Sequence, residues 1–517
     1  MNETTDAAPK PAPAPYSPGR LRYNSFSIVY MQVFSVERFD RSLVRSGFFE
    51  PKDPADSVDR QIFMDPSPVE RYTARGFDFS LTVEKPEDVR GIADGFPDRV
   101  RVEGRMAVDV SVFFGRTVSV TYRMVVDGKN CRRDGPVSTD CLISLSSLSM
   151  GAEHWSYDAG KKLSTINLDI PEMRIGDLYL DGAGGWLAAP VSLDGVPDCG
   201  FVEAQQRYKR MIAGSNGIPG LRDIHYVYVD VWEDVEHTGG LFREMTEPQI
   251  VSHIFHRHRP ELIGLMSLYP YEWPYRAEEC FGEVCGANVA IDTDDLILVN
   301  QNMCLVVGTY GLRGEEAPTN WRRHLEERAK YHVSWPEYLL VLEMVLARKY
   351  TVAAALDLFL GQAQTLCSQT VRRTRRAIEC NARRGLELTE LLLELDAVKY
   401  SRYVSHKLMF ERTARRLEVD KETGRLNASM EKIDRSLFNI SEMRKLRQTM
   451  TLNLVLGTIT AASLLGILFN RVEMPFLHEI GMDRFSGAGL YVILLVLALL
   501  VGSPLIIALN YFKNNKN

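Results

Sequence analysis

Amide and hydroxyl side chains recur at intervals of three and four residues in an uncharged segment, residues 448–470. This spacing places them on one face of a helix. Polar groups are costly against lipid, so the face should meet other helices or water, either by close helix packing or by lining an ion pathway. Five of the seven positions on the face are polar, namely Thr449, Asn453, Thr460, Ser463 and Asn470.

The element that carries these residues is one of two long uncharged runs, 448–470 and 486–512. A helix of about 23 residues reaches roughly 34 Å, and a bilayer core is about 30 Å thick. Arg444, Lys445 and Arg447 precede the first run, and Lys513 follows the second. The positive-inside rule therefore predicts transmembrane helices at 451–470 and 487–511, an extracytoplasmic loop at 471–486, and both termini in the cytoplasm, with a basic tail at 512–517.

The rest of the chain is predicted to form a large cytosolic part. Residues 1–20 are rich in Pro and Ala and predict a disordered tail. Residues 21–317 alternate strand-like runs and turn clusters, which predicts an α/β domain with a subdivision near residue 200. The clearest strands are predicted at 25–33, 77–83, 108–126, 224–232 and 296–309, and helices at 201–212 and 247–268.

Residues 318–450 are almost free of Pro and Gly and predict a helical hairpin and a stalk. Breaks are expected at Arg384-Gly385 and at Thr423-Gly424, where a glycine can adopt the left-handed helix cap. Beyond the second break, a helix of roughly 70 Å should run from about residue 425 to 470. The predicted fold class is therefore α+β, with an α/β domain, a long stalk and two transmembrane helices.

Composition limits the function. The net charge of −6 gives no reason to expect direct nucleic-acid binding. Eight cysteines without a CxxC pair are typical of reduced thiols. There is no phosphate-binding loop, nucleophile elbow or metalloprotease helix, so the sequence predicts a protein that is not an enzyme.

Two membrane helices cannot enclose a channel, so a pore requires several copies of the chain. The loop after the first run carries Asn470, Met474, Pro475 and Leu477 at the offsets of the Asn and the Met-Pro-Glu-Leu element of the CorA-type magnesium transporters. The second run ends in Tyr-Phe-Lys, as that family does. Over roughly residues 290–517 the chain resembles this family.

The resemblance implies a homopentameric funnel in a bacterial inner membrane, gated by its cytosolic domain. Asn470 would meet a hydrated divalent cation at the outer mouth, with magnesium as the transported or regulatory ion. Leu468 and Phe469 replace the Gly-Met of the family signature, and Arg471 directly follows the Asn, with Glu473 placed to neutralise it. These departures and the large N-terminal domain favour an alternative: a membrane effector of antiviral defence activated by a small-molecule or nucleotide ligand.

Three further groups of residues are candidates for binding. One is an arginine cluster that would meet membrane lipids or an anionic ligand, namely Arg372, Arg373, Arg375, Arg376, Arg383 and Arg384. Another is a regulatory divalent-cation site or a solvated turn at Asp292, Asp294 and Asp295. His253 and His256 share a helix face, and a zinc ion there would need a third or fourth ligand, either Glu261 or a cysteine.

Overall fold

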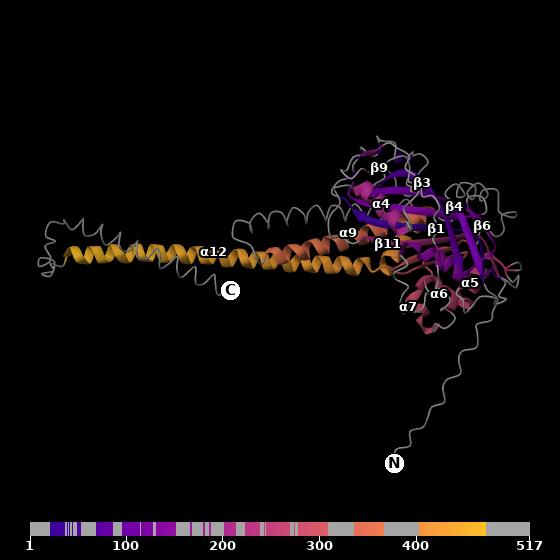
Figure 1. Ribbon diagram of the computed structural model, residues 1–517. Coiled ribbons are helices and arrows are strands. Elements are labelled where there is room, and N and C mark those ends of the chain that lie inside the picture. The colour runs from indigo at the N-terminus through magenta and orange to yellow at the C-terminus, as the bar shows by residue number, and fades with distance from the viewer. Residues whose placement is uncertain are drawn as a thin grey trace, which may run out of the picture. The chain divides into compact units, whose positions relative to one another are not determined.

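Figure 1 shows the protein as a computed structural model. The structure describes residues 21–36, 39, 41, 44, 49–52, 69–85, 96–113, 115–127, 131–150, 166–167, 179–180, 186–187, 201–213, 223–237, 242, 245–268, 273, 278–308, 336–366 and 403–471. They fall into two compact units, Met1–Asn427 and Ala428–Asn517.

The first unit is built on a mixed sheet with the strand order β12-β13-β11-β1-β5-β4-β3-β2, to which β6, β7 and β8 add short pairings. Among the described strands, every pairing in this sheet is antiparallel except that of β11 with β13. A separate hairpin pairs β9 (Tyr179–Leu180) with β10 (Trp186–Leu187). The sheet strands are β1 (Leu21–Ser35), β2 (Phe49–Pro51), β3 (Val69–Glu84), β4 (Arg99–Phe113), β5 (Thr117–Val126), β6 (Cys131–Arg133), β7 (Val137–Ser138), β8 (Ile166–Asn167), β11 (Ile224–His237), β12 (Asp295–Val299) and β13 (Met303–Gly308).

Several predicted elements are present but divided. The predicted strand 108–126 is a hairpin of β4 and β5, with Gly115 at φ 69° in the turn between them. The predicted strand 296–309 is likewise the hairpin of β12 and β13. The predicted helix 247–268 is two helices, α5 (Glu247–Arg257) and α6 (Arg259–Ser267), because Pro260 lacks the amide hydrogen that would continue α5.

One face of the sheet is apolar and is covered by α3 (Thr139–Ser146), the 3-10 turn η3 (Ser147–Met150) and α4 (Phe201–Ala213). Tyr122 of β5 meets Phe201 and Tyr208 of α4 edge to face, with ring centroids 5.5 Å apart in both pairs. Aromatic pairs of this geometry stabilise a core beyond the area that they bury. The apolar face therefore forms the main core of the first unit.

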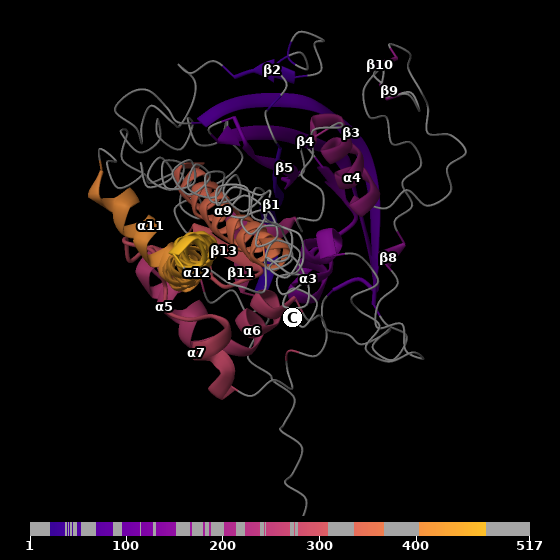
Figure 2. The same ribbon diagram turned by 90° about the vertical axis from the view of Figure 1, so that its left-hand side faces the viewer.

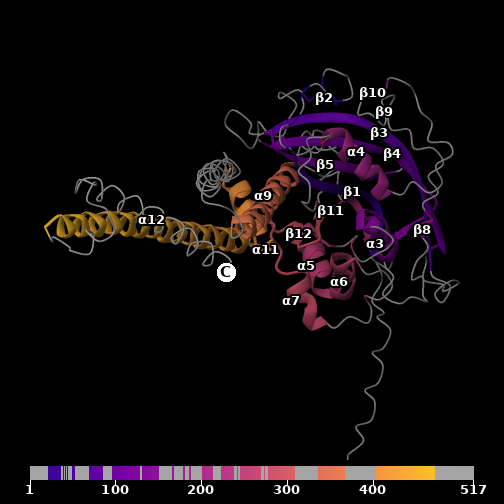
Figure 3. The same cartoon turned by 60° about the vertical axis from the view of Figure 1, so that its left-hand side comes forward.

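The opposite face carries α9 (Pro336–Leu366), which crosses β1, β5 and β11. In Figure 2 the long strands β3 and β4 curve around one side of the sheet, and α9 runs inside that curve. Near β12 and β13 the helices α5, α6 and α7 (Phe281–Val284) lie together, with the 3-10 turn η8 (Glu278–Cys280) preceding α7 (Figure 3).

Two arginines of helix α11 (Val404–Arg416) bond to the part of the first unit around β12. Arg412 Nη1 donates to the carbonyl of Ala290 at 2.8 Å. Arg416 Nε donates to the carbonyl of Val299 at 2.9 Å, and its Nη2 donates to the backbone carbonyl of Glu283 at 2.6 Å. These bonds satisfy backbone carbonyl groups of α7, of β12 and of the segment between them, and they fix the position of α11.

Helix α12 runs without interruption over Val419–Arg471, which confirms the predicted long helix. The predicted break at Thr423-Gly424 is wrong, because both residues lie inside α12. The chain instead breaks at Glu418, whose φ of 56° ends α11 and allows α12 to start in a new direction.

The membrane predictions are overturned. Among the residues that the structure describes, no helix is long and apolar enough to cross a membrane. Polar side chains such as Asn453, Thr458 and Thr460 interrupt the apolar part of α12. The predicted localisation, the transmembrane helices and the fold class that includes them are therefore wrong for these residues, whose fold is the mixed sheet with its helices. The second uncharged run, 486–512, lies outside the described residues.

Candidate functional site

The face of the sheet beneath α9 is polar along β3, β4 and β5, where a covered face should be apolar. Strand pairing sets Thr73 of β3 opposite Asp109 of β4, and Asp109 opposite Thr121 of β5. The next row on the same face joins Arg71, Ser111 and Ser119. Since a sheet face that carries a helix is normally apolar, this polar face is the first candidate for a site.

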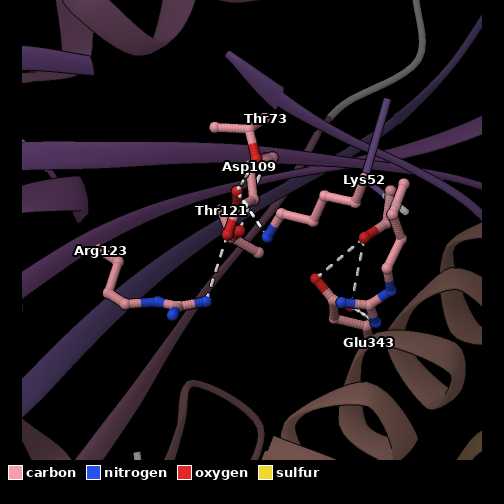
Figure 4. Close-up of polar contacts among 8 residues, drawn as sticks. Lys52, Thr73, Asp109, Thr121, Arg123 and Glu343 are labelled. Carbon is pink, nitrogen blue, oxygen red and sulfur yellow. Dashed lines mark hydrogen bonds and ion pairs between the residues drawn. The ribbon is translucent and has the colours of Figure 1, made fainter. Parts of the chain in front are cut away.

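Asp109 is the centre of the first row (Figure 4). Lys52 Nζ lies 2.8 Å from its Oδ1 and Arg123 Nη2 lies 3.3 Å from its Oδ2. The hydroxyl of Thr73 donates to Oδ1 at 3.2 Å. Burial alone would raise the pKa of Asp109, but the charges of Lys52, Arg123 and Arg71 outweigh burial and hold this pKa below its ordinary value. Asp109 is therefore an anion that orders two cations around it.

Glu343 brings a second carboxylate to the face from α9. Its Oε2 lies 2.9 Å from Arg71 Nη2, and Ser111 donates to the same oxygen at 3.3 Å. Only 3% of the Glu343 side chain is exposed. About two turns further along α9, Thr351 and Thr117 of β5 share a hydrogen bond of 3.2 Å. Helix α9 is thus held to the sheet by polar contacts as well as by packing.

The cluster holds three cations, Lys52, Arg71 and Arg123, and two carboxylates, Asp109 and Glu343, so its formal charge is 3 − 2 = +1. The side chains of Lys52, Arg71 and Arg123 are 35%, 19% and 15% exposed. A cluster of this charge, part-buried yet open on the side of Lys52, can bind an anion. We call these five residues the charged cluster.

A second polar group, in the core, is fully buried. Glu261 accepts from Thr139 at 2.5 Å and lies 3.2 Å from His258 Nδ1. The carboxylate stands between the hydroxyl and the imidazole, whereas a catalytic triad requires the imidazole in the middle. Together with the hydrogen bond from Trp273 to Asp140 at 2.8 Å, this group joins α3 to α6 and the chain after it, and its role is structural.

The predicted polar face of α12 is described over most of its length. Thr449, Thr460 and Ser463 each donate to the carbonyl four residues earlier, at 2.7 to 2.9 Å. Asn453 is exposed, and Asn470 is the last residue but one of α12. Arg471 ends the helix, while Glu473, Met474 and Pro475 lie outside the described residues. The ion pathway, like the family resemblance that these loop residues carry, stays a prediction.

The structure does not gather the predicted metal ligands. Asp292 lies in an exposed turn, while Asp295 is buried at the start of β12. His253 and His256 lie on α5, and their neighbour His258 is buried against Glu261. Within the described ranges, no group of three or more His, Cys, Asp or Glu side chains could hold a metal ion. The six arginines at 372–384 lie outside those ranges.

The charged cluster was not predicted, although β5 carries a signal for it. In this strand Thr117, Ser119, Thr121 and Arg123 alternate with apolar residues, a pattern that normally marks a strand with one face in water. Three of these polar residues are nevertheless buried. No protein-family model, curated protein or solved structure matches the chain.

Proposed function

We propose that this protein assembles with copies of itself through α12 and that a small-molecule ligand bound to the sheet domain controls the assembly. The observation that carries the proposal is the apolar surface of α12. Nine large apolar side chains of α12 are between 40% and 71% exposed in the single chain. They are Phe438, Met443, Leu446, Met450, Leu452, Leu454, Leu456, Ile459 and Leu464.

Such a surface is unusual for a chain that stays alone in water. Burying one Leu or Met side chain contributes about 1.5 to 3 kcal/mol. Contiguous exposed apolar side chains therefore favour association. The charge-free part of α12 is one continuous helix, so the exposed apolar side chains on it are available to a partner along that helix.

A second copy of the same helix, in parallel and in register, fits this surface best. Residues 420–447 of α12 carry charges of both signs, and residues 448–470 carry none. Parallel copies place the uncharged halves against each other. Antiparallel copies would place charged residues such as Glu431 and Arg435 against the apolar half, which costs desolvation energy. The family resemblance predicts five copies.

Helix α9 connects the charged cluster to the start of α12 within the first unit. Glu343, seven residues after the start of α9, contacts the sheet, whereas Arg348 lies 3.7 Å from Asp420 in the first turn of α12. The hydroxyls of Tyr338 on α9 and Thr413 on α11 share a bond of 3.0 Å. A ligand that alters the contact of Glu343 therefore acts on a helix that also touches α11 and α12.

The test is the mass of the full-length protein in solution, measured by light scattering after size exclusion. We expect a wild-type mass of several chains and a smaller mass for the double variant Leu446→Lys/Met450→Lys. Val404→Lys is the matched control, because Val404 is an exposed apolar residue of α11. A monomeric wild type, or a double variant with the wild-type mass, would contradict the proposal.

A further inference from the structure

We infer that the charged cluster is a binding site for the phosphoryl group of a small molecule, held by Lys52, Arg71 and Arg123. The inference deepens the proposed function by naming the ligand class and the site, and it rests on that function only for the effect of the ligand on assembly. Binding itself is measured separately.

The three cations approach from different strands. Arg71 belongs to β3, Arg123 to β5, and Lys52 follows β2, the edge strand of the sheet. Lys52 and Arg123 reach Asp109 from opposite sides (Figure 4). A planar carboxylate is satisfied by one arginine that approaches it edge on, whereas a tetrahedral phosphoryl group has oxygens that accept from several directions. The arrangement of donors around this point favours the phosphoryl group.

Hydroxyl groups add neutral donors to the same face. Thr73 and Thr121 flank Asp109, and Ser111 lies in the next row. Ser119, opposite Ser111, has 0% exposure, and in the described part of the chain its Oγ has no hydrogen-bond partner. A buried hydroxyl without a partner is unfavourable and often marks the place of an absent water or ligand. This second observation points independently to a bound polar group beneath α9.

The ligand would reach the charged cluster from the edge of the sheet. Lys52 is the most exposed cation of the cluster, and β2 has no strand on its outer side among the described residues. Phosphoryl oxygens that entered here would meet Lys52 first and then the two arginines. Since Glu343 already occupies Arg71, the ligand would compete with this carboxylate and loosen the polar contact between α9 and the sheet.

The experiment is isothermal titration of the full-length chain at constant ionic strength with pyrophosphate, ADP and citrate. We expect pyrophosphate and ADP to bind and citrate to bind at least about tenfold more weakly. Comparable affinities for pyrophosphate and ADP would indicate recognition of the phosphoryl group alone, and tighter binding of ADP would identify a nucleotide as the source. Citrate binding as tight as that of pyrophosphate would overturn the ligand class.

Three variants locate the site. Lys52→Met and Arg123→Met should each weaken binding of pyrophosphate at least about tenfold, because each removes a charge-assisted hydrogen bond. Arg41→Met is the matched control, since Arg41 is exposed and pairs with Glu70 outside the cluster. Lys52 is the safer substitution because its side chain is the more exposed. Unchanged affinity in Lys52→Met and in a folded Arg123→Met, or no binding of pyrophosphate to the wild type, would overturn the inference.

Binding of the ligand and assembly of the chain can fail independently of each other. If pyrophosphate binds at the charged cluster but the mass of the protein is that of one chain with and without it, the site stands and the proposed function fails. If the wild type assembles through α12 but binds neither pyrophosphate nor ADP, assembly stands and the phosphoryl site is wrong.

Discussion

Arg71 and Glu343 lie 272 positions apart in the sequence, yet their side chains meet at 2.9 Å between β3 and α9. The arginine keeps 19% of its side chain exposed, whereas the glutamate keeps 3%. The two partners thus differ in how easily each could return to water if the other were removed.

This difference predicts unequal effects of substitution. Arg71→Leu leaves a buried, uncompensated carboxylate and should lower the free energy of unfolding by about 3 to 5 kcal/mol. Glu343→Leu leaves an arginine that can turn toward solvent, and its effect should be smaller. The double variant should recover most of the loss. Urea denaturation of all three proteins measures the effects, and equal losses in the two single variants would contradict this explanation.

Asp109 predicts a dependence of stability on pH. Its pKa is lower in the folded protein than in the unfolded chain, so its ion pairs stabilise the protein above the ordinary Asp pKa of about 3.9, and this contribution is lost as the pH falls through the folded pKa. Asp109→Asn should therefore be destabilised at pH 7 by about 1 to 3 kcal/mol, and the difference should narrow below about pH 4.

Urea denaturation at a series of pH values measures this difference. Asp292→Asn, in an exposed turn, is the control and should follow the wild type throughout. A gap between Asp109→Asn and the wild type that stays constant down to pH 3 would show that the ionised carboxylate is not the cause.

Gly76 lies at the irregularity where the pairing of β3 with β4 shifts between Ala74 and Phe77. A Cβ at this position would lie 2.0 Å from the carbonyl oxygen of Met106, which belongs to the backbone of β4 and cannot move aside alone. Gly76→Ala should therefore cost about 2 to 3 kcal/mol in thermal or urea unfolding. Gly424→Ala, on an open surface of α12, should be neutral or stabilising by up to about 1 kcal/mol.

A substitution at Gly286 tests how Arg416 holds α11 in the first unit. Its φ is 70°, and a Cβ there would lie 2.8 Å from the guanidinium of Arg416, the group that bonds Val299 and Glu283. Gly286→Ala should destabilise the first unit by about 1 to 3 kcal/mol through backbone strain and the displaced arginine. Gly282→Ala, four residues earlier with no neighbour within 4 Å, is the matched control. Equal unfolding midpoints of the two variants would contradict the role of Arg416.

The sequence predicts the elements of this fold better than their boundaries. Alternating or continuous apolar residues predict β1, β3 and β11. These strands are long, so the pattern of apolar side chains extends over enough residues to be recognised in the sequence. The β4 to β5 turn escapes prediction because its only clear signal is Gly115, inside an otherwise apolar stretch. The turn at Glu418 is missed for the opposite reason: Gly424 offers a better local signal, but tertiary contacts of Arg412 and Arg416 decide where α11 ends.

The charged cluster could not be predicted from local spacing in the sequence. Its members come from positions 52, 71, 109, 123 and 343, and no local spacing relates them. They meet because β3, β4 and β5 pair in one register and because α9 crosses the face on which they lie. Only the pairing of the strands shows which of these residues meet. In the sequence alone, the polar residues of β5 have the pattern of a strand with one face in water.

The position of β1 also sets an order of folding. This strand lies between β5 and β11, and its pairing joins Leu21 to His237. During synthesis, one edge of a long, largely apolar strand stays open until more than two hundred further residues have left the ribosome. Contacts this distant in sequence form slowly, and open strand edges favour aggregation. Expression of shortened chains that stop before β11 should therefore yield insoluble protein, whereas chains that include β13 can close the sheet.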